Sequence, residues 1–147
     1  MWIGAPIPPE LGVFPGYLLA RLGETSRRRF AEVMGPTGLD GRHFRVLTIV
    51  GVRPGMTQQQ LHEKTSIDPS SMVAVIDELE TRGFAERRQD PDDGRARTIF
   101  LTPAGERFVR RITRLATELQ DELLAPLDKH ERVTLHTLLR KLTGSEA

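Results

Sequence analysis

The chain has 147 residues, a formal net charge of +1 and no cysteine. This length suffices for one domain with a core, or for a small domain with a dimerising extension, and the lack of cysteine excludes a disulfide framework and a thiol redox sensor. No apolar run approaches the roughly 20 residues of a membrane span, and the start Met1-Trp2-Ile3-Gly4 lacks the features of a secretion signal, so we expect a cytoplasmic protein that does not enter the membrane.

The N-terminal region is predicted to form one long helix that reaches Met34. Its apolar positions fall at helical spacing, at Leu11, Phe14, Leu18 and Leu22. Gly35-Pro36-Thr37-Gly38 closes this helix. A second helix begins after Asp40, with Phe44, Leu47 and Val50 facing inward.

A helix-turn-helix pattern starts at Thr57. Thr57 and Gln60 form a capping-box pair, which predicts a helix through Lys64. Asp68-Pro69 then supplies an N-cap and a first helical residue for a second helix. The second helix has a buried face at Met72, Val75, Ile76 and Leu79, and an outer face at Ser70, Ser71, Val73, Ala74 and Asp77.

A charged hairpin follows the second helix, which Gly83 ends. Residues 84–88 and 97–101 are predicted strands around the Pro-, Asp- and Gly-containing loop at 89–95. Five arginines occur in this stretch, at Arg82, Arg87, Arg88, Arg95 and Arg97, with acidic residues between them. Lys and Arg side chains give affinity for nucleic acids by neutralising phosphates, and a net charge of +1 supplies little of this general affinity. The position of these arginines therefore matters more than the net charge of the chain. The alternative is a solvated hairpin.

The C-terminal region is predicted to be a helical hairpin. Thr102-Pro103 begins a helix with an apolar stripe at Phe108, Ile112, Leu115, Leu119 and Leu123, and Pro126 ends it. A last helix starts near Asp128 and carries Val133, Leu135, Leu138, Leu139 and Leu142. These stripes fit either a monomer core or a dimer interface. We favour a homodimer because the terminal helices are long relative to the small central domain.

This order of elements predicts a mainly α fold with a small two-stranded β wing, a winged helix-turn-helix flanked by N- and C-terminal dimerisation helices. The predicted divisions are residues 1–36, 37–103 and 104–147. A helix shaped for a DNA groove, followed by an arginine-bearing ribbon, favours binding to double-stranded DNA. Because a fold does not fix function, a winged-helix module that binds protein remains the alternative.

An enzyme is not expected. The four histidines show no metal-ligand spacing, no cysteine is present, and no Gly-rich phosphate loop occurs. The acidic loop at 90–94 lacks the alternation and the closing Glu of a calcium loop. We therefore predict no catalytic residue, no metal and no cofactor.

Several of these motifs together resemble the MarR family of bacterial transcriptional regulators. The resemblance rests on Leu61, Ser70-Ser71, Asp77, Leu79, Arg82-Gly83-Phe84, Arg87-Arg88, the 90–95 loop and the 101–105 segment Leu-Thr-Pro-Ala-Gly. It implies a triangular homodimer that binds palindromic operator DNA and usually represses transcription, often until a phenolic or other lipophilic ligand loosens it. The lack of cysteine excludes the thiol-based peroxide sensors of that family.

The resemblance places the recognition helix at residues 69–82, beginning with Pro69. Its start would meet base edges, with Ser70 and Ser71 as candidates for hydrogen bonds and Val73 and Ala74 for contacts with thymine methyl groups. The two serines have an alternative role, which is to assist the N-cap. In a dimer, the two recognition helices would address half-sites about 10 base pairs apart.

In the wing, Arg95 is predicted to enter a narrow minor groove, where the negative potential is strongest. Asp93 would brace the loop or pair with an arginine, and Arg97 would reach a phosphate or pair with Asp93. Contacts with the DNA backbone are predicted for Gln58, Gln59, Lys64, Arg87 and Arg88, with solvated surface as the alternative.

The resemblance also implies a ligand pocket near the first two helices, for which the candidates are Tyr17, Arg21, His43 and Val46. Arg21 would pair with a ligand carboxylate, and His43 would donate a hydrogen bond or change charge near pH 6 to 7. The alternatives are an intersubunit ion pair for Arg21 and a surface position for His43.

Overall fold

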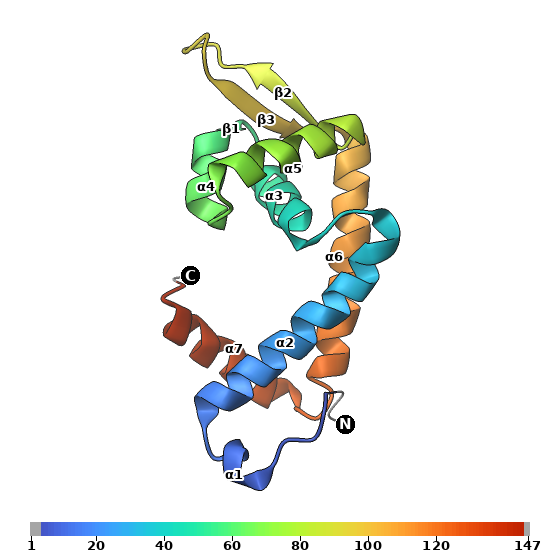
Figure 1. The fold of residues 1–147 in the computed structure, drawn as a ribbon, viewed down its shortest axis with the longest axis vertical. Coiled ribbons are helices and arrows are strands. Elements are labelled where there is room, and N and C mark those ends of the chain that lie inside the picture. The colour runs from blue at the N-terminus through green and yellow to red at the C-terminus, as the bar shows by residue number, and fades with distance from the viewer. Residues whose placement is uncertain (1–3, 146–147) are drawn as a thin grey trace. The chain divides into compact units, whose positions relative to one another are not determined.

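The fold is taken from a computed structural model, which describes residues 4–145 (Figure 1). Its helices are α1 (Pro9–Gly12), α2 (Pro15–Met34), the 3-10 turn η1 (Gly35–Thr37), α3 (Gly41–Val52), α4 (Gln58–Thr65), α5 (Pro69–Thr81), α6 (Pro103–Leu123) and α7 (Lys129–Thr143). Its strands are β1 (Met56–Thr57), β2 (Ala85–Gln89) and β3 (Arg97–Leu101). None of the helices in this described range is both long and apolar enough to cross a membrane.

The chain forms two compact units. One, which we call the terminal unit, contains residues up to Arg29 and from Thr117 onward, and the other, the central unit, contains residues 30–116. Helices α2 and α6 each contribute to both units. The predicted division after residue 36 lies within η1 and that after residue 103 lies at the start of α6, whereas the compact units divide within α2 and α6.

The N-terminal region differs from the prediction of one continuous helix, which was wrong. The chain forms the short helix α1, leaves helical structure at Val13 and Phe14, and starts α2 at Pro15. A proline disfavours the helical conformation of the residue before it and lacks an amide proton, so the helix restarts at Pro15. The apolar periodicity was read correctly for α2 but does not detect this break.

Four predicted helix starts are confirmed by their caps. Asp40, Thr57, Asp68 and Asp128 each accept a backbone hydrogen bond at the start of α3, α4, α5 and α7, respectively. At the other end of α5, Gly83 has a φ of 71°, which few other residues adopt readily. The helix-turn-helix boundaries therefore follow from local side-chain chemistry.

The sheet has three strands in the order β1-β3-β2, all antiparallel. Arg87 pairs with Ile99 in the β2–β3 ribbon, and Met56 pairs with Ile99 on its other side. The two-stranded wing is present, but β1 extends the sheet beyond the prediction. A two-residue strand is too short to show an alternating pattern, which explains why it was missed.

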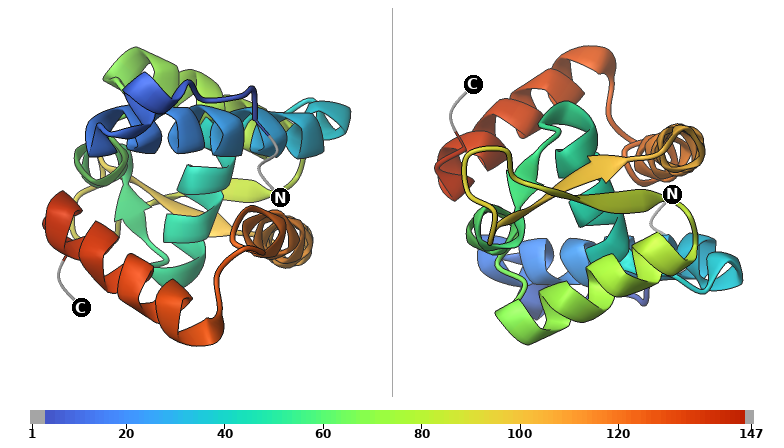
Figure 2. Two further views of the ribbon diagram at one scale, coloured as in Figure 1. Left: turned by 90° about the horizontal axis from the view of Figure 1, so that it is seen from below. Right: turned by 90° about the horizontal axis from the view of Figure 1, so that it is seen from above.

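The hydrophobic core lies in the central unit, where α3, α4, α5, β3 and α6 contribute fully buried side chains such as Leu47, Leu61, Ile76, Ile99 and Ile112. Strand β2 packs near α5, and β3 packs near α3 (Figure 2). The start of α6 approaches the hairpin closely, because a Cβ added at Gly105 would lie 1.9 Å from the carbonyl oxygen of Phe84. This contact fixes where the hairpin leads into α6.

Candidate nucleic-acid interface

The start of α5 is organised by Asp68. Its carboxylate accepts hydrogen bonds from the Ser70 hydroxyl at 2.7 Å and from the Ser71 backbone N–H at 2.9 Å. These hydrogen bonds hold the pKa of Asp68 well below its usual range. The helix-capping role considered for the serines is thus present in the structure. The Ser70 side chain is nevertheless exposed, and its oxygen retains acceptor capacity.

Beyond its first turn, α5 has a buried apolar face and an exposed face of short side chains. Met72 and Ile76 are buried in the core, whereas Val73 is 43% exposed and Ala74 is also exposed. The exposed surface that follows the serines therefore consists of short side chains, which allow close approach and offer apolar contact.

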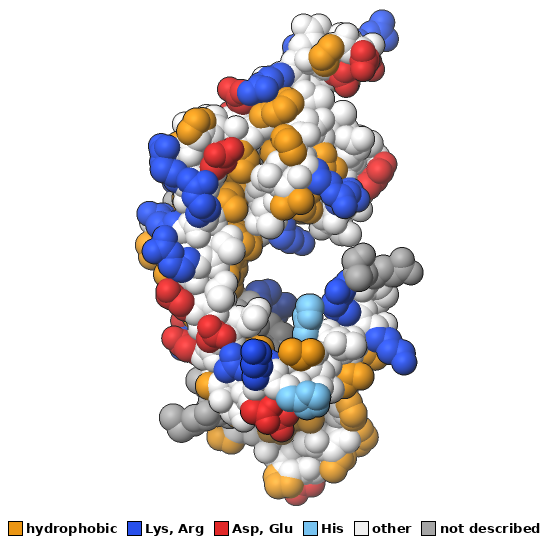
Figure 3. All heavy atoms as spheres, turned by 180° about the vertical axis from the view of Figure 1, so that it is seen from behind, with side chains coloured by type: hydrophobic (Ala, Val, Ile, Leu, Met, Phe, Trp, Pro, Cys, Tyr) orange, Lys and Arg blue, Asp and Glu red, His pale blue; other side chains and the backbone are white. Residues whose placement is uncertain are grey.

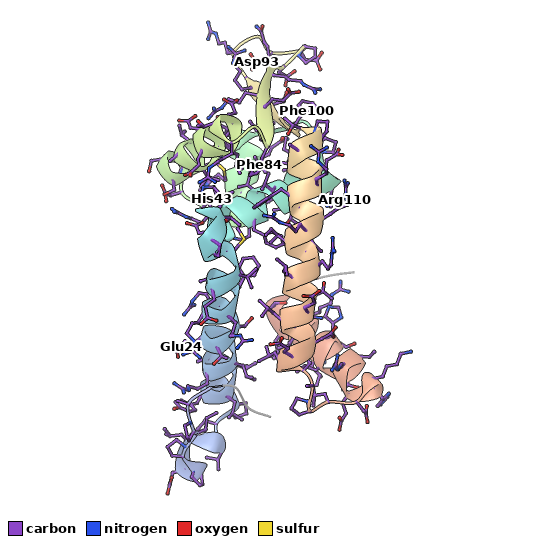
Figure 4. The ribbon with its side chains drawn as sticks, turned by 90° about the vertical axis from the view of Figure 1, so that its right-hand side faces the viewer. Glu24, His43, Phe84, Asp93, Phe100 and Arg110 are labelled. Carbon is purple, nitrogen blue, oxygen red and sulfur yellow. The ribbon has the colours of Figure 1, made fainter. Side chains whose placement is uncertain are left out.

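The tip of the wing is held by Asp93, which Figure 4 labels at the end of the hairpin. Its carboxylate accepts a hydrogen bond from the Arg95 backbone N–H at 3.0 Å, and its carbonyl accepts one from the Ala96 N–H at 3.1 Å. Asp93 braces the loop through backbone groups, and no ion pair with Arg97 is formed. Of the two roles considered for Asp93, bracing the loop and pairing with an arginine, the structure shows the bracing of the loop.

The side chains of Arg95 and Arg97 are exposed. Within residues 4–145, neither guanidinium group makes a hydrogen bond or an ion pair. Two unpaired cations at the end of a braced ribbon form a cationic surface that an anionic partner could contact without breaking existing bonds.

Arg87 lies in a different environment, at the junction of α4, α5 and β2. Its guanidinium group is 2.7 Å from the Asp77 carboxylate, 3.1 Å from that of Glu80 and 3.0 Å from the Gln58 amide oxygen. The Arg87 side chain is only 19% exposed. A phosphate contact by the Arg87 guanidinium would compete with these bonds, whereas Gln58 takes part through its amide oxygen and its N–H donors face no such competition. The sequence reasoning missed this cluster, although the i,i+3 spacing of Asp77 and Glu80 was a usable signal.

The remaining predicted backbone contacts are more accessible. Arg88 pairs with Glu86, and its guanidinium carbon lies 3.9 Å from the centroid of the Phe100 ring. Gln59 donates a hydrogen bond to Glu63 at 3.1 Å, while Lys64 is exposed. The structure therefore presents Lys64 and Gln59 at the surface of α4.

The four predicted ligand-pocket residues are divided between the two units. Tyr17 and Arg21 belong to the terminal unit, where Arg21 lies 3.6 Å from Glu24 and donates to the Ala5 carbonyl at 3.4 Å. In the central unit, Val46 is fully buried and His43 is 5% exposed. The alternative that His43 is a surface residue was wrong.

The burial of His43 has a local cause. Its Nδ1 accepts the Asp40 backbone N–H at 3.1 Å as the second half of a capping box, and its Nε2 is 3.6 Å from a Glu78 carboxylate oxygen (Figure 4). Both ring nitrogens thus face groups of the central unit. Among residues 4–145, no group of three or more His, Asp or Glu side chains is arranged to hold a metal ion.

A capped helix pair, a braced antiparallel wing and flanking helices define a winged helix-turn-helix protein. The sequence profile described as the MarR family matches residues 37–96. A protein of Thauera aromatica described as a transcriptional regulatory protein for the hcr operon is 30% identical over 128 residues, which cover 86% of this chain and 77% of the relative. The chain belongs to the MarR family of transcriptional regulators.

Two solved structures share most of the fold. The transcriptional repressor CouR bound to a 23-mer DNA duplex has a TM-score of 0.81 and 28% identity, with 95% of this chain and 99% of CouR covered. The PcaV regulator of Streptomyces coelicolor in complex with its natural ligand has a TM-score of 0.72 and 26% identity, with coverages of 95% and 99%. The predicted fold class and family are thereby confirmed.

Proposed function

We propose that the protein is a cytoplasmic transcriptional repressor that binds a palindromic operator as a homodimer. The observation that carries this proposal is the wing tip, where Arg95 and Arg97 are exposed and have no partner among the described residues. Guanidinium groups in this position suit a narrow minor groove and the phosphates beside it. The similarity to a DNA-bound repressor supports the same use.

Sequence choice is assigned to the start of α5. Ser70 and Ser71 offer hydroxyl groups to base edges, and Val73 and Ala74 offer apolar contact to thymine methyl groups. Lys64 and Gln59 on α4 are proposed to contact phosphates. Arg87 is assigned a structural role in the central unit instead, because its guanidinium group is bonded to the Gln58 amide oxygen and to two carboxylates.

Dimerisation is assigned to the terminal unit. Its helix α7 exposes large apolar side chains, with Val133 at 60%, Leu138 at 53% and Leu142 at 72%. Apolar surface of this kind is stabilised when a second copy covers it. A symmetric dimer would carry two recognition helices, which is why a palindromic operator follows from the proposal.

Control by a small molecule completes the proposal. The PcaV structure was obtained with that protein's natural ligand, which supports the view that regulators of this fold respond to small molecules. We infer that a ligand releases this protein from its operator by favouring a state in which the two recognition helices of the dimer no longer fit both half-sites.

Selection of bound sequences from a randomised DNA duplex pool tests the proposal. Wild type is compared with Arg95→Ala and with Arg110→Ala, which removes an exposed arginine of α6 as a matched control. We expect wild type and the control to enrich a two-fold symmetric site, and Arg95→Ala to enrich it more weakly. Failure of folded wild type to enrich any site would favour a protein-binding winged-helix module.

A further inference from the structure

An open pocket of about 410 Å³ lies in the central unit, away from the wing tip and from the start of α5. It is lined by Thr37, Arg82, Phe84, Ala104, Arg107, Phe108 and Arg111. These residues come from η1, the turn after α5 and the first turns of α6. The volume falls within the range of about 300–1,000 Å³ that is typical of small-molecule sites.

Two aromatic rings form an apolar wall of the pocket. The Phe84 and Phe108 rings are stacked, with centroids 4.5 Å apart and an interplanar angle of 20°. Phe108 is 7% exposed and belongs to the core, so its position is fixed by packing. Because each ring covers one face of the other, a flat organic group would meet chiefly the accessible part of Phe84, which is half-buried, and aromatic rings favour both offset-stacked and edge-to-face contact.

Arg107 and Arg111 provide the charge of the pocket. Both side chains are exposed, and across the described residues neither forms a hydrogen bond or an ion pair. The Arg111 guanidinium carbon lies 5.4 Å from the Phe108 ring centroid, so charge and aromatic wall are adjacent. No lining residue is acidic.

Arg82 differs from the other two arginines because it is already bonded. Its guanidinium group donates to the Thr37 carbonyl at 2.6 Å and lies 3.3 Å from the Glu78 carboxylate. Arg82 is also the C-cap residue of α5. It therefore connects the pocket to the end of the proposed recognition helix.

The surroundings increase the positive potential of this side of α6. Arg110 and Arg114 are exposed on the same helix, outside the pocket lining, and Lys and Arg side chains gather over α6 (Figure 3). Figure 4 labels Arg110 on this helix and Phe84 beside it. Of the acidic residues, Glu106 precedes Arg107 in the first turn of α6, and Glu78 pairs with Arg82.

We propose that this pocket binds an aromatic dianion, such as an aryl phosphate or an aryl dicarboxylate. Arg107 and Arg111 would hold the two negative charges, because guanidinium groups bind phosphate and carboxylate through paired N–H donors. The ring would lie against Phe84 and Phe108. Resting on the proposed repressor function, a second part of the inference is that the anion competes with Thr37 and Glu78 for Arg82 and so shifts the end of α5.

Phenyl phosphate is the probe, since it joins a ring to a group with close to two negative charges at pH 7.5. Calorimetric titration of the full chain without DNA should give saturable binding. Arg107→Gln combined with Arg111→Gln should weaken binding by at least about tenfold, because two charge-assisted contacts are lost. The matched control, Arg110→Gln combined with Arg114→Gln, should change affinity by less than about threefold, through the general potential alone.

Two further compounds test the two halves of the site. Inorganic phosphate lacks the ring and benzyl alcohol lacks the charge, so both should bind more weakly than phenyl phosphate. No saturable binding of phenyl phosphate up to about 5 mM, which corresponds to less than roughly 3 kcal/mol of binding free energy, would overturn the site. Equal losses in the two double variants, or equal affinity for inorganic phosphate, would also overturn it.

Coupling to DNA is measured separately, with the operator obtained by selection. We expect phenyl phosphate to weaken operator binding by wild type and to leave binding by the Arg107→Gln/Arg111→Gln variant unchanged. Binding of the probe with no change in operator affinity would overturn the coupling while leaving the site in place. If no operator exists, the calorimetric result still decides whether the pocket binds an aromatic dianion.

Discussion

The two compact units of this chain bury their apolar side chains to very different extents. In the central unit, residues from Met34 to Ile112 form one closed core, and its largest members, such as Leu47 and Ile76, are fully buried. In the terminal unit, large apolar side chains remain exposed, namely Leu11, Val13, Phe14, Leu19, Leu22, Val133, Leu138 and Leu142. Helical propensity and caps are present in both units, so the difference lies in what covers the apolar faces.

This contrast indicates that the two units have different roles. A closed core can hold the capped α5 and the braced wing in fixed positions without help from another chain. Exposed apolar area is not stabilising by itself, so in the proposed homodimer the apolar face of α7 gains its stability from the partner surface. We therefore expect substitutions in the two units to act on different observables, stability in the central unit and assembly in the terminal unit.

The largest effect is expected when charge is placed on the exposed face of α7. Leu138→Asp combined with Leu142→Asp should weaken dimerisation by at least roughly 100-fold, since carboxylates would be buried without partners, and operator binding should weaken with it. Light scattering after size-exclusion chromatography measures the mass. Val52→Asp, at a valine of the central unit that is 76% exposed, is the control and should leave the dimer intact. A dimeric double variant would contradict the assignment of the interface to α7.

Two glycines provide the next test. Gly105→Ala would place a methyl group 1.9 Å from the Phe84 carbonyl oxygen, so the start of α6 must move away from the hairpin. We expect a loss of about 3 kcal/mol in the free energy of unfolding, at the upper end for overpacking. Gly23→Ala in α2 meets no atom within 4 Å in the described chain and should stabilise that helix by about 0.5–1 kcal/mol.

Urea unfolding of both glycine variants distinguishes the two units. A stabilised Gly23→Ala protein would show that this position faces solvent in the assembled protein as well. A destabilised one would place Gly23 against a partner chain and so extend the interface to α2. Wild-type stability in Gly105→Ala would contradict the close approach between the hairpin and α6.

Local signals in the sequence predicted most of the central unit. The Thr57–Gln60 capping box, the Asp68-Pro69 helix start and Gly83 each act within a few residues, and the structure places them as expected. The break at Phe14 was missed because an apolar stripe continues across it, although Pro15 was visible. Strand β1 was missed because it exists only through pairing with β3, about forty residues later.

The candidate site was less predictable, because identical residue types have different surroundings. Arg87 and Arg95 were assigned to DNA contact from the same arginine-rich stretch, but only Arg87 is enclosed by Asp77, Glu80 and Gln58. That enclosure depends on how α5 and β2 meet in space. The pocket between η1 and α6 depends in the same way on segments far apart in sequence.

Substitution of Arg87 or Arg95 by alanine is expected to change stability by a smaller amount. Arg87→Ala leaves the carboxylates of Asp77 and Glu80 without their cation, and these are partly exposed, at 59% and 35%, so solvent limits the loss to about 1–2 kcal/mol. Arg95→Ala removes an exposed side chain and should change stability by less than about 0.5 kcal/mol. Thermal unfolding should show a fall of several degrees for Arg87→Ala alone. Equal melting temperatures would indicate that the Arg87 cluster contributes nothing.

The smallest effect concerns Asp68 at the start of α5. Hydrogen bonds from Ser70 and Ser71 hold the pKa of its carboxyl below the ordinary value of 3.8 in the folded protein. Protonation is therefore less favourable in the folded state than in the unfolded state, so this carboxylate stabilises the fold above about pH 4 and loses that contribution as the pH falls further. The stability difference between wild type and Asp68→Asn should accordingly shrink between pH 6 and pH 3.

Removing the strongest of these hydrogen bonds by Ser70→Ala should raise the pKa of Asp68, which a carbon-detected NMR titration measures residue by residue. An unchanged pKa in Ser70→Ala would mean that the serine hydroxyl is not bonded to Asp68 in solution and is free for a base edge.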